Sequence, residues 1–212
     1  MPNPVIIFGA NGLGKAAYEI FRSHGVDVYG LLDDNKALHG TEVDETTVLG
    51  KTMDDGFLKL IGKKCDAFVA TDDNAERRSL TEMLNSRRKV MPVNAVHSRA
   101  VLAPSAILKH GTFVNSGAQI GAFAALGNHC IIHSNAVVDF EATLADFVQV
   151  GAGSIINHNV TVGEGAFIGS GATVVANVSI GAGARIGAGS LVIQDVPENT
   201  TVFGVPAKAV DA

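Results

Sequence analysis

The chain has 212 residues, of which 47% are hydrophobic and 17% charged, so one or two domains with a substantial buried core are expected. Its formal net charge of −5 argues against nucleic acid as a partner, because phosphate backbones are bound by clustered Lys and Arg. No signal segment and no apolar run of roughly 20 residues is visible, so we expect a cytoplasmic protein without a membrane partner. Cys65 and Cys130 lack metal-ligand spacing, so buried thiols and no bound metal are predicted.

The first ninety residues alternate between apolar, strand-like segments and helical segments. Strands are predicted at residues 5–10, 26–34 and 66–73, helices at 16–25 and 74–88, and an extended piece at 89–97. Alternation of this kind is typical of a small parallel sheet covered by helices. We therefore predict a Rossmann-like α/β domain over residues 1–95.

A glycine-rich turn, GANGLGK, follows the first predicted strand. Gly9, Gly12 and Gly14 form GxxGxG, which differs from the GxGxxG of nicotinamide dinucleotide folds. Backbone N–H groups at the start of a helix nevertheless suit a phosphate, and Asp33 follows at a distance from which an acid often reaches a ribose or a base. A tight turn without a ligand is the alternative interpretation.

The rest of the chain has a six-residue repeat. Every sixth residue from Leu102 to Val192 is Leu, Ile or Val, and the residue two positions before it is mostly small. An α-helix cannot keep such a period on one face, whereas a chain that turns a corner every six residues can. Three sides close a triangular coil of 18 residues, with the aliphatic residues inside and small residues at the corners. We predict this β-helix over residues 96–212, including the tail.

The repeat resembles that of the hexapeptide-repeat acyltransferases, whose coils form a left-handed parallel β-helix. GVPAK at residues 204–208 is similar to the segment after the last coil in these enzymes. With the α/β domain, GxxGxG and LDD, the whole chain resembles one subfamily, the sialic acid O-acetyltransferases and nucleotide-linked aminosugar N-acetyltransferases of the bacillosamine-precursor type. The resemblance implies acetyl-CoA as co-substrate and a homotrimer. Outward residues are expected to face neighbouring subunits at Ala152, Val160, Ala166 and Val178.

The same resemblance assigns candidate binding residues. The sugar nucleotide is expected at Asn11, Gly12, Leu13, Asp33, Asp34, Asn74 and His133. CoA is expected at Gln149, Ser170, Ala188 and Lys208. The family more often has a histidine in place of Leu13 and a Gly-Asn pair in place of Asp72 and Asp73, so the identity of the nucleotide stays open.

The family's catalytic motif is a histidine followed by an acidic residue, but this chain has Phe140 and then Glu141. A second family histidine aligns with Gln149. His158 comes 18 residues after Phe140, which predicts that it stacks on Phe140 from the next coil. His158 is the first candidate for a displaced base or a substrate contact, and Glu141 is the remaining acid of the motif. A structural corner histidine, with no residue acting as base, is the alternative.

Reaction chemistry favours an amine acceptor. A sugar hydroxyl attacks a thioester poorly without a positioned base, whereas an amine needs only to be neutral. This chemistry favours N-acetylation over O-acetylation. The family resemblance implies that the acceptor is a nucleotide-linked amino sugar, a 4-amino-4,6-dideoxy sugar of surface glycan biosynthesis. Two alternatives stay open: a sugar O-acetyltransferase that uses His158, and a catalytically silent sugar-nucleotide-binding or scaffold protein.

Overall fold

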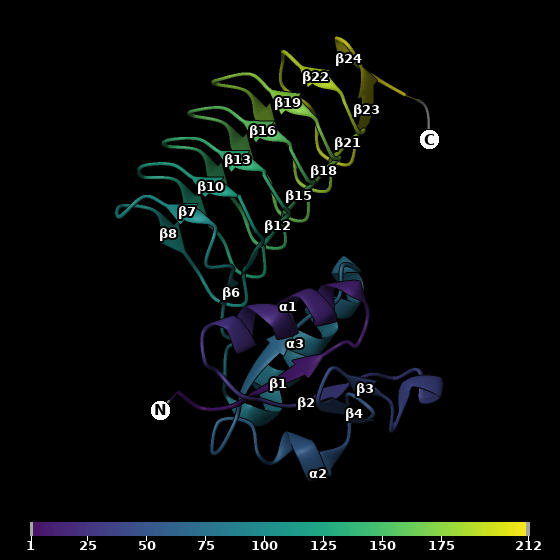
Figure 1. Cartoon of the computed structure of the whole chain (residues 1–212). Coiled ribbons are helices and arrows are strands. Elements are labelled where there is room, and N and C mark those ends of the chain that lie inside the picture. Colours follow the sequence, from purple (N-terminus) through teal and green to yellow (C-terminus); the bar gives the residue numbers. More distant parts are fainter. Residues whose placement is uncertain (1, 211–212) are drawn as a thin grey trace. The chain divides into compact units, whose positions relative to one another are not determined.

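The computed structural model describes residues 2–210 and divides the chain into two compact units, one ending at Ser98 and the other beginning at Arg99 (Figure 1). The first unit is an α/β domain and the second a parallel β-helix. Both predicted fold classes are confirmed. Within the described residues, no helix has the length and apolar character needed to cross a membrane.

The N-terminal sheet has the strand order β3-β4-β2-β1-β5. Its strands are β1 (Val5–Phe8), β2 (Val28–Leu32), β3 (Glu42–Val43), β4 (Thr46–Gly50) and β5 (Asp66–Val69). All neighbouring pairs are parallel except β3 with β4, which form an antiparallel hairpin at one edge. Sequence reasoning missed this hairpin because its Thr and Glu residues lack the apolar run that marked the buried strands. A short β6 (Ala95–Val96) ends the unit.

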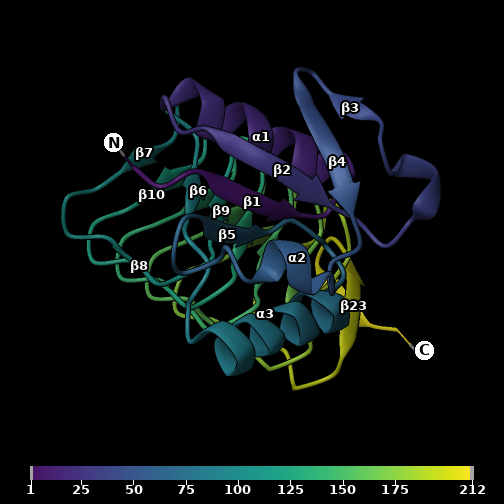
Figure 2. The same cartoon turned by 90° about the horizontal axis from the view of Figure 1, so that it is seen from below.

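Helices cover both faces of this sheet (Figure 2). Helix α1 (Gly12–Ser23) lies on one face, and α2 (Asp55–Leu58) and α3 (Asn74–Arg88) lie on the other, with a 3-10 turn at Lys36–Leu38. The residues of α3 match the prediction, whereas α1 begins earlier than residue 16 because Asn11 caps it. Phe21 of α1 meets Phe68 of β5 edge to face, with ring centroids 5.7 Å apart.

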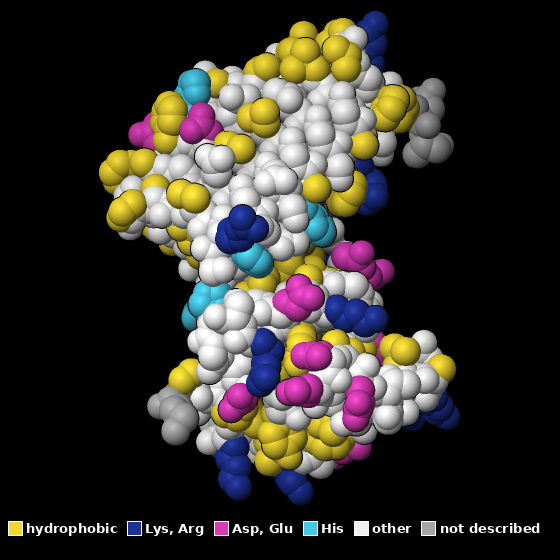
Figure 3. Space-filling view, viewed as in Figure 1, with side chains coloured by type: hydrophobic (Ala, Val, Ile, Leu, Met, Phe, Trp, Pro, Cys, Tyr) yellow, Lys and Arg dark blue, Asp and Glu magenta, His cyan; other side chains and the backbone are white. Residues whose placement is uncertain are grey.

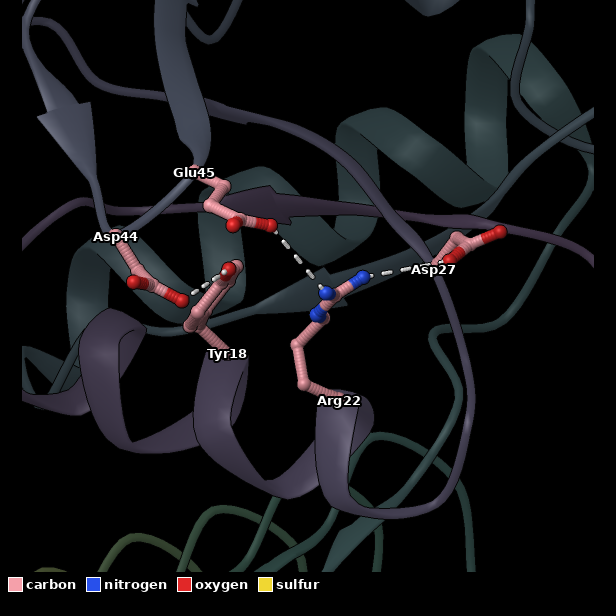
Figure 4. Close-up of polar contacts among 5 residues, drawn as sticks. All are labelled: Tyr18, Arg22, Asp27, Asp44 and Glu45. Atoms are coloured by element: carbon pink, nitrogen blue, oxygen red, sulfur yellow. Dashed lines mark hydrogen bonds and ion pairs between the residues drawn. The ribbon is translucent and has the colours of Figure 1, made fainter.

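The turn of the β3–β4 hairpin is tied to α1 by polar contacts (Figure 4). The buried Tyr18 hydroxyl donates to Asp44 Oδ2 at 3.1 Å. One turn further along α1, Arg22 forms ion pairs with Glu45 at 3.7 Å and Asp27 at 3.4 Å. The ion pairs are exposed and stabilise little, so the Tyr18 hydrogen bond is the stronger tie.

The β-helix consists of two-residue strands that repeat in three parallel sheets. The first sheet contains β7 (Val101–Leu102), β10 (Gln119–Ile120), β13 (Val137–Val138), β16 (Ile155–Ile156), β19 (Thr173–Val174) and β22 (Leu191–Val192). The second contains β8 (Ile107–Leu108), β11 (Ala125–Leu126), β14 (Thr143–Leu144), β17 (Thr161–Val162) and β20 (Ser179–Ile180). The third contains β9 (Phe113–Val114), β12 (Ile131–Ile132), β15 (Gln149–Val150), β18 (Phe167–Ile168) and β21 (Arg185–Ile186), extended by β23 (Thr201–Gly204) and the antiparallel β24 (Ala207–Ala209).

Most strand residues of the β-helix pair with the residue 18 positions later, as in Val137 with Ile155. At the end of the stack the spacing falls to 16, as in Arg185 with Thr201. We call the turns that follow the first, second and third sheets the first, second and third corners. Residues 139–142 and 157–160 lie in the first corner, and residues 169–172 and 187–190 lie in the third.

Side chains of two repeat positions fill the interior. From Val114 onward the aliphatic residue of every hexad is at most 3% exposed, as predicted. The small residues two positions earlier also point inward, and Ala118, Ala136 and Ala172 are 0% exposed. The prediction that Val160, Ala166 and Val178 face outward is therefore wrong: they occupy this second position, on the same side of the chain as the aliphatic residue, and are buried. Ala152 is exposed.

Candidate active site

Phe140 and His158 stack on each other in the first corner. They lie at equivalent positions after β13 and β16, so the coil repeat places one above the other. Their ring centroids are 4.7 Å apart and their planes differ by 6°. The predicted stacking is confirmed. Because Ala122 and Ala176 occupy the equivalent positions on either side, the two rings project beyond their neighbours in this row.

A carboxylate faces the imidazole of His158. Asp139 Oδ2 lies 4.0 Å from His158 Nδ1, within ion-pair range, and the two side chains are 36% and 39% exposed. The other carboxylate oxygen, Asp139 Oδ1, accepts a hydrogen bond from the Phe140 N–H at 2.8 Å. One peptide segment therefore supplies both the ring under His158 and the acid beside it.

Glu141 occupies a different kind of position. It has a left-handed backbone conformation, with φ of 58°, and its side chain is exposed. Its N–H donates to the Ala122 carbonyl at 2.9 Å, which holds the corner to the preceding coil. Within residues 2–210 no ion pair joins Glu141 to His158, so the acid beside this histidine is Asp139. The sequence motif gave no role to Asp139, because the acid of the motif is the one that follows position 140.

The remaining predicted residues of the β-helix lie away from the first corner. Gln149 is on β15 in the third sheet and is 6% exposed, and His133 is half-buried in the third corner. Ser170 and Ala188 are exposed at equivalent positions of the third corner in successive coils. The exposed Lys208 lies on β24, paired with Phe203.

The third corner carries small residues at positions 170–171 and 188–189, while the Phe203 ring of β23 packs on Gly187 beside them. Gly171 and Gly189 follow Ser170 and Ala188 with φ of 69° and 68°, and a Cβ on either would contact nothing within 4 Å. The tail is tied to this corner, since the Gly204 N–H donates to Ser190 Oγ at 3.1 Å. Three predicted cofactor residues, Ser170, Ala188 and Lys208, therefore belong to the third corner and the adjoining tail.

The three glycines of the glycine-rich turn in the first unit differ in their surroundings. The fold requires two of them and does not require the third. A Cβ on Gly9 would collide with the Ala70 carbonyl, and one on Gly14 would collide with the Gly9 carbonyl. A Cβ on Gly12 would meet nothing within 4 Å. Gly9 and Gly14 thus permit close packing of strand and helix, whereas the surface above Gly12 is open.

Asn11 caps α1 at the same turn. Its Oδ1 accepts hydrogen bonds from the N–H groups of Leu13 at 3.0 Å and Gly14 at 3.1 Å. Two of the first N–H groups of the helix are therefore satisfied by the protein itself. Gly12, whose Cβ position is open, follows the capping residue directly.

The predicted acids at the end of β2 are held by backbone and hydroxyl groups. Asp33 accepts hydrogen bonds from the Ala10 N–H through Oδ2 and the Asn35 N–H through Oδ1, both at 2.8 Å. Asp34 accepts from the Thr52 N–H at 3.0 Å and the Thr52 hydroxyl at 2.9 Å.

Asn74 begins α3 after β5, and its Oδ1 accepts a hydrogen bond from the buried Arg77. Asn11, Asp33 and Asn74 follow β1, β2 and β5, which are adjacent parallel strands. The carboxyl ends of such strands share one edge of the sheet, where ligands of open α/β folds bind. The structure therefore brings the predicted nucleotide residues of this unit to one edge.

A second acidic group links coils at the second corner. Asp146 accepts hydrogen bonds from the N–H and side-chain amide of Asn128, at 2.8 and 3.0 Å. Burial acts to raise the pKa of Asp146, but these hydrogen bonds, with nearby Lys109 and His129, hold that pKa below its ordinary value. The carboxylate is therefore a stabilising charged group in the coil stack.

Cys65 and Cys130 are both buried, as predicted. In the part of the chain that the structure describes, no three His, Cys, Asp or Glu side chains are grouped closely enough to hold a metal ion.

Two family models match the chain. The PglD N-terminal domain matches residues 4–84, and the bacterial transferase hexapeptide model matches residues 141–176 and 159–194. A comparison with curated protein sequences found no match.

Several solved structures are similar over the whole chain. A mutant of perosamine N-acetyltransferase from Caulobacter crescentus, in complex with CoA and GDP-perosamine, is 34% identical, with a TM-score of 0.91 over 100% of this chain and 99% of that chain. The acetyltransferase domain of PglB from Neisseria gonorrhoeae, in complex with acetyl coenzyme A, is 28% identical, with a TM-score of 0.89 over 99% and 100%. WeeI from Acinetobacter baumannii shares the fold at 21% identity, with a TM-score of 0.87 over 98% and 99%.

An α/β unit followed by a hexapeptide β-helix defines the molecule as a hexapeptide-repeat transferase. The chain belongs to the family of hexapeptide-repeat sugar acetyltransferases that carry a PglD-type N-terminal domain.

Proposed function

We propose that this acetyltransferase uses acetyl-CoA to acetylate the amino group of a nucleotide-linked amino sugar. The observation that carries the proposal is the similarity, over essentially the full length of both chains, to a perosamine N-acetyltransferase in complex with CoA and GDP-perosamine. We further propose that the acceptor is a 4-amino-4,6-dideoxy sugar used in surface glycan biosynthesis.

The nucleotide is proposed to bind at the carboxyl edge of the N-terminal sheet. Open space above Gly12 supports a phosphate there, beside the positive end of α1. Asn11 and Leu13 flank it, and Asp33, Asp34 and Asn74 border the nucleoside. Because Asp33 and Asp34 already accept hydrogen bonds, we expect them to hold the loops in place as well as to contact the nucleoside.

Acetyl-CoA is proposed to lie along the third corner. An extended pantetheine chain needs a surface without large side chains, and the strip of Ser170, Ala188 and the glycines after them offers one. The exposed Lys208 supplies a cation for a phosphate of CoA.

Catalysis is proposed to require a homotrimer with roughly parallel β-helices. The stacked pair lies in the first corner and the proposed CoA strip in the third, so a neighbouring copy is needed to bring the two together. Hydrophobic side chains gather at one edge of the β-helix, near β7, β8, β10 and β13 (Figure 3). The largest exposed hydrophobic side chains of this region are Val101, Ile107, Phe123, Phe140 and Ile155. We call these five residues the apolar ridge and propose that it contacts the neighbouring subunit.

An amine acceptor fits the replacement of the family's histidine by Phe140. A neutral amine attacks a thioester without prior deprotonation and becomes strongly acidic only after attack, so a base is needed only to accept that later proton. A hydroxyl requires a base during attack. One observation favours O-acetylation as a second candidate: the first corner still holds an imidazole beside a carboxylate, His158 with Asp139.

The test is release of CoA thiol from acetyl-CoA across UDP-, GDP- and dTDP-linked amino sugars. Each sugar is paired with the matching compound that has a hydroxyl in place of the amine. We expect turnover with at least one amino sugar and none with its hydroxyl partner. Turnover with the hydroxyl compounds would establish O-acetylation. No thiol release with any compound would support a silent binding or scaffold protein.

A further inference from the structure

We infer that the general base of the proposed reaction is His158, one coil away from the position of the family's histidine, and that Asp139 is the residue that positions its ring. The kinetic effects expected from this inference rest on the proposed function.

Two groups of one preceding segment lie against the imidazole of His158. The Phe140 ring lies parallel to the imidazole at 4.7 Å, which restricts tilting of His158. Asp139 Oδ2 faces Nδ1 at 4.0 Å. This separation is longer than a hydrogen bond, and a small rotation of either exposed side chain closes it. A carboxylate at Nδ1 favours the tautomer that carries its proton there, which leaves Nε2 as the proton acceptor.

Asp139 is itself held in place. Its Oδ1 accepts the Phe140 N–H at 2.8 Å, so the carboxylate is anchored to the same turn that carries the stacking ring. Glu141 has no such contact with the histidine in the described chain, and its left-handed backbone belongs to the turn itself. The pair that orients His158 is therefore Asp139 and Phe140.

The proton balance of the step needs no other reactant. The amine nitrogen attacks the thioester carbonyl carbon, an N–C bond forms and the C–S bond breaks. The ammonium proton passes to His158 Nε2 and then to the departing CoA thiolate, which leaves as thiol. The products are the acetamido sugar and CoA, and the histidine returns to its neutral form.

A double-mutant cycle tests the assignment. We expect His158→Asn to lower kcat by about 100-fold or more, and Asp139→Asn by about 10-fold or more, with little change in KM for acetyl-CoA. If Asp139 acts through His158, then Asp139→Asn should have no further effect in the His158→Asn background. Asp139→Glu should recover part of the loss.

Asp195→Asn is the matched control. Asp195 is an exposed carboxylate of the same β-helix. It accepts a backbone N–H, from Ser179 at 2.8 Å, and has no histidine partner in the described chain. The kcat of Asp195→Asn should stay within about two-fold of the wild-type value, because the Asp195 carboxylate does not face an imidazole. If the loss of kcat in Asp139→Asn were fully additive with that in His158→Asn in the double variant, the positioning role of Asp139 would be overturned. A loss seen only in Glu141→Gln would also overturn it.

A second measurement does not depend on turnover. Long-range proton–nitrogen correlation spectra of the histidine rings report which nitrogen of His158 carries the proton. We expect the Nδ1–H tautomer in the wild-type protein and a shift away from it in Asp139→Asn. An Nε2–H tautomer that is unchanged by Asp139→Asn would refute the inference, even if no aminosugar released thiol and the proposed function failed.

Discussion

The rings of Phe140 and His158 lie parallel, with centroids 4.7 Å apart, because an 18-residue coil places equivalent residues one above the other. A side chain lost from one coil can therefore be replaced functionally by a side chain of the next coil, because both project from the same row. The imidazole of His158 therefore lies within one strand spacing of the Phe140 ring.

A histidine at position 140 should rescue the loss of His158. We expect Phe140→His in the His158→Asn background to recover at least about 10-fold of the lost turnover, because it returns an imidazole to the family's position. The measurement is steady-state thiol release at neutral pH. Phe140→Leu in the same background is the control and should recover nothing. Equal rates in the two double variants would contradict this prediction.

Gly12→Val should block binding of the sugar nucleotide. The side chain would occupy the open surface above Gly12, where we place the phosphate, while the folded protein has room for it. We expect at least about 10-fold weaker binding in calorimetric titration, equivalent to about 1.4 kcal/mol.

CoA affinity and the melting temperature of Gly12→Val should remain near wild type. Unchanged nucleotide affinity would mean that the glycine turn is only structural. A large fall in melting temperature would instead show that the turn itself was disturbed.

Ala188→Leu should weaken binding of CoA without affecting the nucleotide. The added side chain would stand in the small-residue strip of the third corner, and a steric conflict of this kind costs about 1–3 kcal/mol. CoA titration by calorimetry provides the measurement. Ala182→Leu is the matched control, since Ala182 occupies the same repeat position at the second corner of the same coil. Equal effects of the two variants would count against a CoA site at the third corner.

The assembled protein should have three times the chain mass of 21.9 kDa, about 66 kDa, in sedimentation equilibrium at micromolar concentration. Phe123→Glu should shift the equilibrium toward the monomer, because it places a charge on the apolar ridge at a side chain that is 68% exposed. Met53→Glu, an equally apolar-to-charged change in the N-terminal unit, should leave the mass unchanged. A wild-type mass of 21.9 kDa would contradict both the trimer and a CoA site shared between copies.

Asp146 should make the stability of the β-helix depend on pH in the acidic range. Its pKa in the folded protein lies below the ordinary value of about 3.9, so the ionised carboxylate stabilises the fold above that pH. The contribution is lost as the pH falls through the lower, folded pKa. We expect Asp146→Asn to lower the melting temperature at pH 7 by roughly 2 °C, a small effect because the group is partly exposed.

The difference in melting temperature between wild type and Asp146→Asn should shrink as the pH falls below about 4. Scanning calorimetry at a series of pH values measures it. Glu198→Gln, an exposed acid of the same β-helix, serves as control and should show no such trend. A constant difference from pH 7 to pH 3 would count against the charge-based role.

The sequence by itself determined the two fold classes and the stacking of Phe140 with His158. A strict hexad allows only one arrangement of inward aliphatic residues, and residues 18 apart must then occupy the same row. Strand and helix periodicity likewise determined the α/β unit, apart from the polar β3–β4 hairpin. Periodicity states which residues are neighbours between coils, but not which way a corner side chain points.

Side-chain direction at the corners and turns was decided only by the tertiary structure. Asp139, rather than Glu141, faces His158, because the left-handed backbone at Glu141 is part of the turn. Val160, one of the residues expected to face outward, is buried because the coil turns that repeat position inward. The packed backbone alone distinguishes the three glycines of GxxGxG: Gly9 and Gly14 are required by close contacts, whereas the surface at Gly12 is open. These distinctions depend on contacts between atoms of different coils or of a strand and a helix. Such contacts cannot be inferred from a local sequence pattern.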